Sequence, residues 1–170
     1  MTLGHFQNFP TNLHQIETFT TTLSTRRLQQ MLLQVLQQAN CKEFSFEEVT
    51  NPTIPSGRVI FEFGIAEDEG FNFIDEAEFR KATDFVAKTH VATMDFFCSI
   101  RYYKLEGEKK LPLKFDYFMF KFTFAGGTLE VSVFHERGPR YISPEELVAF
   151  IFNNVNHSSK HRKVLNRMSV

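Results

Sequence analysis

His135 and Cys98 are the side chains of this sequence best suited to acid–base or nucleophilic chemistry. A thiol and an imidazole within hydrogen-bond distance can form a nucleophile–base pair. The segment FFCSI around Cys98 offers neither a cation nor a helix N-terminus to lower the pKa of the thiol. We therefore expect Cys98 to be a buried apolar residue. His135 is expected in the core, with a role as base or ligand anchor as the alternative, and no catalytic residue is assigned.

Two groups of residues have the chemistry of metal ligands but not the pattern. His157 and His161 are four residues apart, but zinc needs three or four ligands and no Glu follows His157. The acidic residues 67–69 and 75–78 do not match an EF-hand loop, and half of them suit the first turn of a helix. We predict no metal site and no cofactor.

A basic and aromatic turn is the strongest polar candidate. Arg137, Arg140 and Tyr141 lie close together, and Lys160, Arg162 and Lys163 follow in the tail. A guanidinium is a planar fork that suits carboxylate or phosphate. We expect a plain surface turn, with contact to an acidic partner or a phosphate as the alternative. The Gly126-Gly127 pair is not a phosphate loop, because it joins two strands and opens no helix.

Composition and charge limit the functional classes. The 170 residues carry 23% charged side chains and a net charge of -1. Residues 41–80 hold ten acidic and three basic residues, whereas residues 147–170 hold four basic and no acidic ones. A DNA-binding domain usually has a basic stripe and a high isoelectric point, so a pI of about 6.6 makes nucleic acid an unlikely partner. The 21 Phe residues, with no Trp, indicate a large apolar core.

The clearest local pattern is a hairpin. Residues 112–124 and 128–136 alternate between apolar and polar side chains and are joined by Gly126-Gly127, a pair that suits a type I′ turn. Partner numbers then sum to 253, and a slip of one residue would destroy the sorting of the two faces. The predicted inner pairs are Phe124–Leu129, Phe122–Val131, Phe120–Val133 and Phe118–His135.

The remaining elements follow from periodicity and capping residues. We expect helices that begin at Ser24, Asp75 and Ser143, each of which can act as N-cap. Further strands are expected at 44–49, 58–67 and 94–105, with a loop at 51–57 and a polar connection at 106–110. Residues 15–23 are interpreted as a strand, with one long helix from residue 12 as the alternative.

These elements predict a two-layer α+β domain. A curved antiparallel sheet of about five to six strands, ending in a three-strand meander, is covered on one face by helices. The element order is similar to the helix-grip layout, in which such a sheet holds a C-terminal helix, and the middle helix is an addition to it. We expect a flexible arm at 1–12, the domain at 13–156 and a basic polar tail at 157–170.

The first functional hypothesis is a non-enzymatic binding or assembly module. Phe97, Tyr103, Met119 and Phe134 are predicted on the outer face of the sheet. Contiguous exposed apolar patches usually mark contact sites. The expected partner is another protein or a second copy of this chain.

The alternative is a carrier of small apolar ligands or a pocket enzyme. Its pocket would lie between the last helix and Phe118, Phe120 and Phe122, with His135 or Tyr102 as the polar anchor. Nucleic-acid binding through the tail and the Arg137/Arg140 turn is a third hypothesis. Two cysteines and no recognisable targeting or membrane-spanning segment lead us to expect a cytoplasmic protein without membrane contact.

Overall fold

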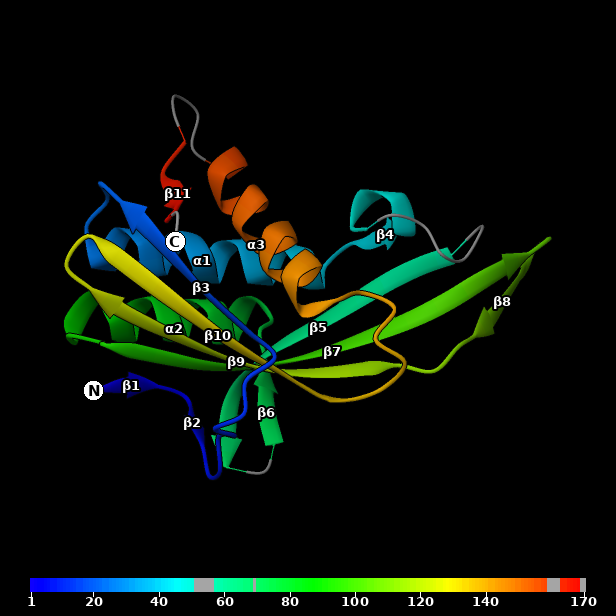
Figure 1. The fold of residues 1–170 in the computed structure, drawn as a ribbon, viewed down its shortest axis with the longest axis horizontal. Helices are drawn as coiled ribbons and strands as arrows, with labels where there is room; N and C mark the ends of the chain where they lie inside the picture. Colours follow the sequence, from blue (N-terminus) through cyan, green and yellow to red (C-terminus); the bar gives the residue numbers. More distant parts are fainter. Residues whose placement is uncertain (51–56, 69, 159–162, 169–170) are drawn as a thin grey trace.

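The computed structural model describes all residues except 51–56, 69, 159–162 and 169–170. It is an α+β structure in which three helices among the described residues cover one face of a mixed sheet that does not close into a barrel (Figure 1). The helices are α1 (Thr25–Asn40), α2 (Glu76–Lys88) and α3 (Pro144–Ser158). No helix in this part of the chain is both long enough and apolar enough to span a bilayer.

The described residues form eleven strands in one sheet. The main order is β11-β3-β10-β9-β7-β5-β2, while β1 and β8 pair with β7, and β4 and β6 pair with β5. The bounds are β1 (Thr2–Leu3), β2 (His5–Phe6), β3 (Gln15–Thr21), β4 (Glu43–Ser45), β5 (Gly57–Asp68), β6 (Gly70–Phe73), β7 (Thr93–Glu106), β8 (Lys109–Pro112), β9 (Asp116–Ala125), β10 (Thr128–Arg137) and β11 (Leu165–Arg167).

The β9–β10 hairpin has the predicted register from Thr128↔Ala125 to His135↔Phe118. Two details differ from the prediction. Among the described residues only Gly127 of the two turn glycines has positive φ, 78°, so the turn is not type I′. A bulge after His135 places Arg137, instead of Glu136, opposite Tyr117. The bulge increases the local twist just before the connection to α3.

The N-caps of the three helices were predicted correctly. Ser24 accepts from the Arg27 N–H, and Asp75 accepts from the Glu78 N–H. At α3, Ser143 and Glu146 exchange hydrogen bonds in a complete capping box. These contacts satisfy N–H groups that the first helical turn leaves without partners.

The inner face of the sheet and the helices enclose the main core. Phe61, Phe63, Phe96, Phe118, Phe120 and Phe122 are each at most 1% exposed. Apolar residues of α1 and α3, among them Leu32 and Ile151, complete this core from the helical side. The alternation in β5, β7, β9 and β10 thus separates inner from outer residues as expected.

Several expectations about short elements were wrong. Residues 44–49 form β4 and a 3₁₀ turn, Phe46–Glu48, because the Ser45–Glu48 capping box favours a turn over a continued strand. Residues 106–110 are not only a connection, since β7 extends to Glu106 and β8 begins at Lys109. The first interpretation of residues 15–23 as a strand is confirmed for residues 15–21, and only its alternative, one long helix from residue 12, was wrong. The expected loop at 51–57 lies almost entirely outside the described residues.

The sheet has a fork that the N-terminal residues fill. β5 and β7 pair from Gly57↔Lys104 to Phe63↔Cys98 and then separate. β1 pairs in parallel with β7, and β2 pairs in parallel with β5. These parallel pairs make the sheet mixed, not purely antiparallel. Residues 1–12, expected as a flexible arm, thus include two short strands, and the expected tail contains β11, which pairs with β3.

Candidate functional site

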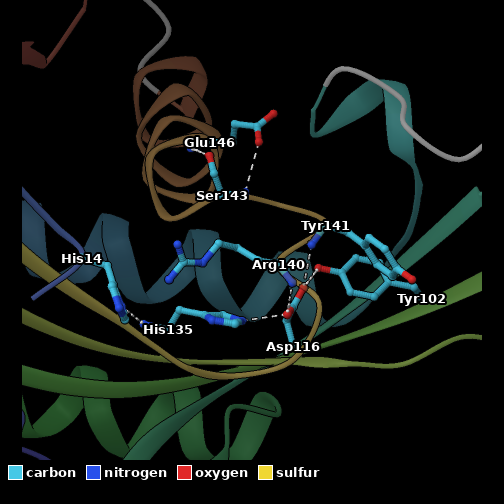
Figure 2. A network of polar contacts seen from close by, with 8 residues as sticks. All are labelled: His14, Tyr102, Asp116, His135, Arg140, Tyr141, Ser143 and Glu146. Carbon is cyan, nitrogen blue, oxygen red and sulfur yellow. Dashed lines mark hydrogen bonds and ion pairs between the residues drawn. The ribbon is translucent and has the colours of Figure 1, made fainter.

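The most densely hydrogen-bonded polar group of the described chain is Asp116, the first residue of β9 (Figure 2). Its side chain is fully buried. Oδ1 accepts from the Arg140 N–H at 2.7 Å and lies 2.8 Å from His135 Nε2. Oδ2 accepts from the Tyr102 hydroxyl at 2.5 Å and from the Tyr141 N–H at 3.2 Å. The carboxylate therefore joins β7, β9, β10 and the connection to α3.

The connection between β10 and α3 is shaped to reach this carboxylate. Gly138 has φ 117°, and a Cβ at this position would overlap Asp116 Oδ1 and the Phe115 carbonyl oxygen. Arg140 is in the left-handed region with φ 61°. Only glycine fits the first position without strain, and the Asp116 carboxylate holds the second through its N–H.

Two histidines lie beside the carboxylate. His135 is nearly buried and presents Nε2 to Asp116, while its backbone N–H donates to His14 Nδ1 at 2.8 Å. His14 also stacks on Phe134, with ring centroids 4.6 Å apart. Desolvation, followed by the charges of Arg140 and His135, lowers the pKa of His14 below its ordinary value. His14 is therefore held as a neutral hydrogen-bond acceptor.

In this network Tyr102 holds the Asp116 carboxylate in place and does not transfer its proton. Burial, and then the hydrogen bond to Asp116, raise the pKa of Tyr102 far above its ordinary value. The phenol therefore stays protonated and acts as a fixed donor. His135 with Asp116 behind it has the geometry of an oriented imidazole.

Cys98 supplies no nucleophile to this network. It is fully buried, and burial together with the Asp116 and Glu62 carboxylates raises the pKa of its thiol well above the ordinary value. A neutral thiol is a weak nucleophile and behaves as a small apolar group. Within the described residues no group of three or more His, Cys, Asp or Glu side chains is placed to hold a metal ion. His161, one of the two spaced histidines, lies outside them.

The outer face of the sheet carries a second cluster. Phe97 pairs with Met119, and Met119 pairs with Phe134, so three of the four predicted patch residues form one row across β7, β9 and β10. Tyr103 lies farther along β7, where it pairs with Pro112. Phe6 and Phe9 cover the row from above, so Met119 is only 8% exposed. We call Phe6, Phe9, Phe97, Met119 and Phe134 the outer cluster.

A polar pair beside the outer cluster holds the first strands. The Asp95 carboxylate, 2% exposed, accepts from the Phe6 N–H at 3.2 Å and from Lys121 Nζ at 2.9 Å. Lys121 Nζ also lies 5.2 Å from the centre of the Phe9 ring. Phe6 stacks on Phe9 and meets Phe97 edge-on. Asp95 and Lys121 thus contact the backbone amide of Phe6 and the ring of Phe9, both in the N-terminal segment.

The residues predicted to line an apolar pocket are packed together instead. Phe118, Phe120 and Phe122 stack along β9, Phe118 contacts the His135 ring, and Phe122 meets Phe152 of α3. Tyr102 and His135, the predicted polar anchors of that pocket, both contact the Asp116 carboxylate. The described residues form grooves elsewhere on the molecule. One of about 330 Å³ follows α1 and α3 over Phe44 and Phe150, and one of about 710 Å³ separates β1, β2 and α2.

The side chains of the predicted basic turn, residues 137–141, contact different neighbours and do not form one cluster. Arg137 lies over the Tyr117 ring at 4.5 Å. Tyr141 packs edge-on against Tyr102, while the Arg140 side chain extends back over His135 toward His14 (Figure 2). The tail residue Lys163 is exposed, and Lys160 and Arg162 lie outside the described residues.

Sequence reasoning missed Asp116, His14 and the two arm aromatics Phe6 and Phe9. For Asp116 a signal existed, because it shares the parity of Phe118 and Phe120 and so belongs to the inner face of the strand. A carboxylate in register with an apolar face needs partners. For Phe6 and Phe9 no periodic signal exists. Comparisons with models of protein families, with curated proteins and with solved structures find no match.

Proposed function

We propose that this protein is a binding module that takes up an extended aromatic segment of a partner protein on the outer face of its sheet. The observation that carries this proposal is the occupation of the fork between β5 and β7 by residues 1–9 of the chain itself. Recognition by strand addition uses main-chain hydrogen bonds for affinity and side-chain sites for specificity. Both parts are present in the contacts of this segment.

The main-chain part comes from β7 and β5. Residues 2–3 run along Thr93 and Met94, and residues 5–6 run along Glu67 and Asp68. The Asp95 carboxylate adds an acceptor for the Phe6 N–H. These contacts are made with the main chain of the segment, so a segment of different sequence could form them as well.

The side-chain part comes from the outer cluster. Phe97, which meets Phe6 edge-on, and Phe134, on which His14 stacks, are half-buried, which indicates a shallow apolar surface. The groove of about 710 Å³ adjoins the same segment along α2, with Leu3, Phe85 and Lys88 among its lining residues. A partner segment longer than residues 1–9 would extend into this groove.

The test uses the chain's own segment as the probe. A fluorescent peptide of residues 1–12 is titrated into full-length protein carrying Phe6→Ala and Phe9→Ala, and binding is followed by anisotropy. We expect saturable binding to this variant and at least tenfold weaker binding to the native chain, whose own segment competes at high effective concentration.

Two matched controls accompany this titration. The same peptide with alanine at both aromatic positions should bind at least tenfold more weakly. A Phe73→Ala variant, which removes an exposed ring outside the outer cluster, should behave like the native chain. The proposal fails if the folded double variant shows no saturable binding of the native peptide.

A further inference from the structure

Arg140 has a backbone conformation that its residue type disfavours. Its φ of 61° lies in the left-handed region, which glycine adopts readily and arginine seldom does. Such conformations persist where surrounding contacts impose them, and they cluster at ligand sites. Here the Arg140 N–H donates to the buried Asp116 carboxylate. The backbone conformation at position 140 favours glycine. We therefore look to the side chain for the reason that an arginine is found there.

The Arg140 guanidinium has no acidic partner within the described part of the chain. No ion pair there includes it, whereas Arg80, Arg101 and Arg167 each contact a glutamate. Asp116 cannot serve, because it is buried behind His135 with both oxygens engaged. The exposed guanidinium instead extends over His135 toward His14 (Figure 2).

His14 supplies a second donor at the same place. Its Nδ1 accepts the His135 N–H, so the proton of the neutral ring is on Nε2. The ring is exposed, and the charges acting on it come from Arg140 and His135, both of which lower its pKa. No acidic group opposes them among the causes of that shift. The Asp116 carboxylate is paired with His135, so the exposed Arg140 guanidinium leaves a positive charge here that no ion pair among the described residues includes.

We propose that the Arg140 guanidinium and His14 Nε2–H form a binding site for an oxyanion, the phosphate or carboxylate group of a ligand. Arginine binds both groups through paired, charge-assisted hydrogen bonds. His135 is a positioning residue, because its backbone N–H fixes the tautomer of His14 and its ring orients the turn through Asp116. His14 also stacks on Phe134 of the outer cluster, but anion binding here does not depend on segment binding.

The test combines two probes with one informative substitution. Inorganic phosphate and acetate are titrated separately at constant ionic strength, set with sodium chloride, while NMR follows the imidazole resonances of His14. In the native protein we expect a saturable shift and an increase in the pKa of His14, because a bound anion favours the charged imidazole and offsets the charge of Arg140. A response to phosphate alone assigns a phosphate ligand, and a response to acetate alone a carboxylate ligand. A response to both assigns a general oxyanion site.

The Arg140→Gly variant separates binding from folding. Glycine suits φ 61°, so this variant should be at least as stable as the native protein while its anion affinity falls at least tenfold. Arg140→Lys keeps the charge without the fork and should bind with intermediate affinity. Arg137→Ala removes a charge three residues away that lies over Tyr117, and it should keep the native response. The proposal is wrong if neither probe gives a saturable shift, or if Arg140→Gly responds as the native protein does.

Discussion

Two buried aspartates, Asp116 on the inner face and Asp95 on the outer face, hold distant segments of the chain in different ways. Asp116 engages a tyrosine hydroxyl, an imidazole and two backbone N–H groups of the connection to α3. Asp95 engages one backbone N–H of the N-terminal segment and the half-exposed Lys121. Both carboxylates accept a main-chain N–H. They differ in the number of donors that would lose their acceptor if the aspartate were removed.

This difference distinguishes a fixed connection from an exchangeable one. Removing a buried acceptor costs the desolvation free energy of every donor that it leaves unpaired. At Asp116 the Tyr102 hydroxyl and the His135 ring are buried, and the N–H groups of Arg140 and Tyr141 are partly buried. At Asp95 the Lys121 amine reaches water, and the Phe6 N–H becomes solvated once its segment leaves the sheet. The outer contact therefore suits a segment that another segment can replace.

The largest expected effect contrasts the two carboxylates directly. Asp116→Ala should lower the free energy of unfolding by about 3–5 kcal/mol, because it leaves several buried polar groups without an acceptor. Asp95→Ala should lower it by about 1–2 kcal/mol, because its partners regain water. Urea denaturation followed by circular dichroism at pH 7 measures both values.

A surface aspartate provides the control for this contrast. Asp84 pairs with Lys88 on the exposed side of α2 at 3.1 Å. Asp84→Ala should change the free energy of unfolding by no more than about 0.5 kcal/mol. Equal losses for Asp116→Ala and Asp95→Ala would contradict the distinction between the two segments.

A second contrast uses two glycines, each next to one of the two aspartates. Gly138→Ala forces a Cβ against Asp116 at a φ of 117° and should cost about 2–3 kcal/mol of global stability. Gly4 has φ 78°, and a Cβ there would lie 2.6 Å from the Asp95 carbonyl oxygen, between β5 and β7. Gly4→Ala should instead cost about 1 kcal/mol and release the segment locally.

Hydrogen exchange distinguishes local release from global destabilisation. In Gly4→Ala the amides of Leu3 and Phe6 should exchange faster while those of β9 keep their protection. Gly126→Ala is the control, because a Cβ there meets open space and its φ is ordinary. Loss of protection throughout β9 in Gly4→Ala would show that the N-terminal segment belongs to the cooperative core.

The parts of the fold that the sequence predicts are those with long periodic patterns. The β9–β10 register follows from ten-residue strands whose inner residues are nearly all Phe, Leu or Val. β1, β2 and β11 have two or three residues each, too few for a period of two to be visible. Their existence depends on a neighbouring strand edge, which only the folded sheet provides.

The candidate sites follow the same division. The row Phe97–Met119–Phe134 is predictable because each residue lies on the outer face of a long strand with a clear alternating pattern. The cover of this row by Phe6 and Phe9 is not predictable, because these two residues are about 90 or more positions away from the row in the sequence. They reach the row only in the folded sheet, across the fork. The Arg140–His14 pair depends in the same way on a turn conformation imposed by Asp116.

Glu17 on β3 is a third buried carboxylate, and it has fewer partners than either aspartate. Its Oε1 pairs with Arg167 of β11 at 2.5 Å, while Oε2 is buried and has no partner among the described residues. Burial raises the pKa of Glu17 above its ordinary value of 4.5, and the Arg167 charge opposes that effect. The folded state therefore binds this proton more tightly than the unfolded state does.

The sign of the resulting pH dependence follows from linkage. Stability should fall as pH rises from about 4.5 through the raised pKa of the folded state and then stay level, because ionisation is less favourable in the folded protein. Glu17→Gln mimics the protonated form, so it should match the native protein near pH 4 and be more stable near pH 7. Unfolding by urea between pH 4 and pH 8 measures this difference. A difference that is constant with pH, or of opposite sign, would mean that the Arg167 charge fully compensates burial and that β11 is held as firmly as the connection at Asp116.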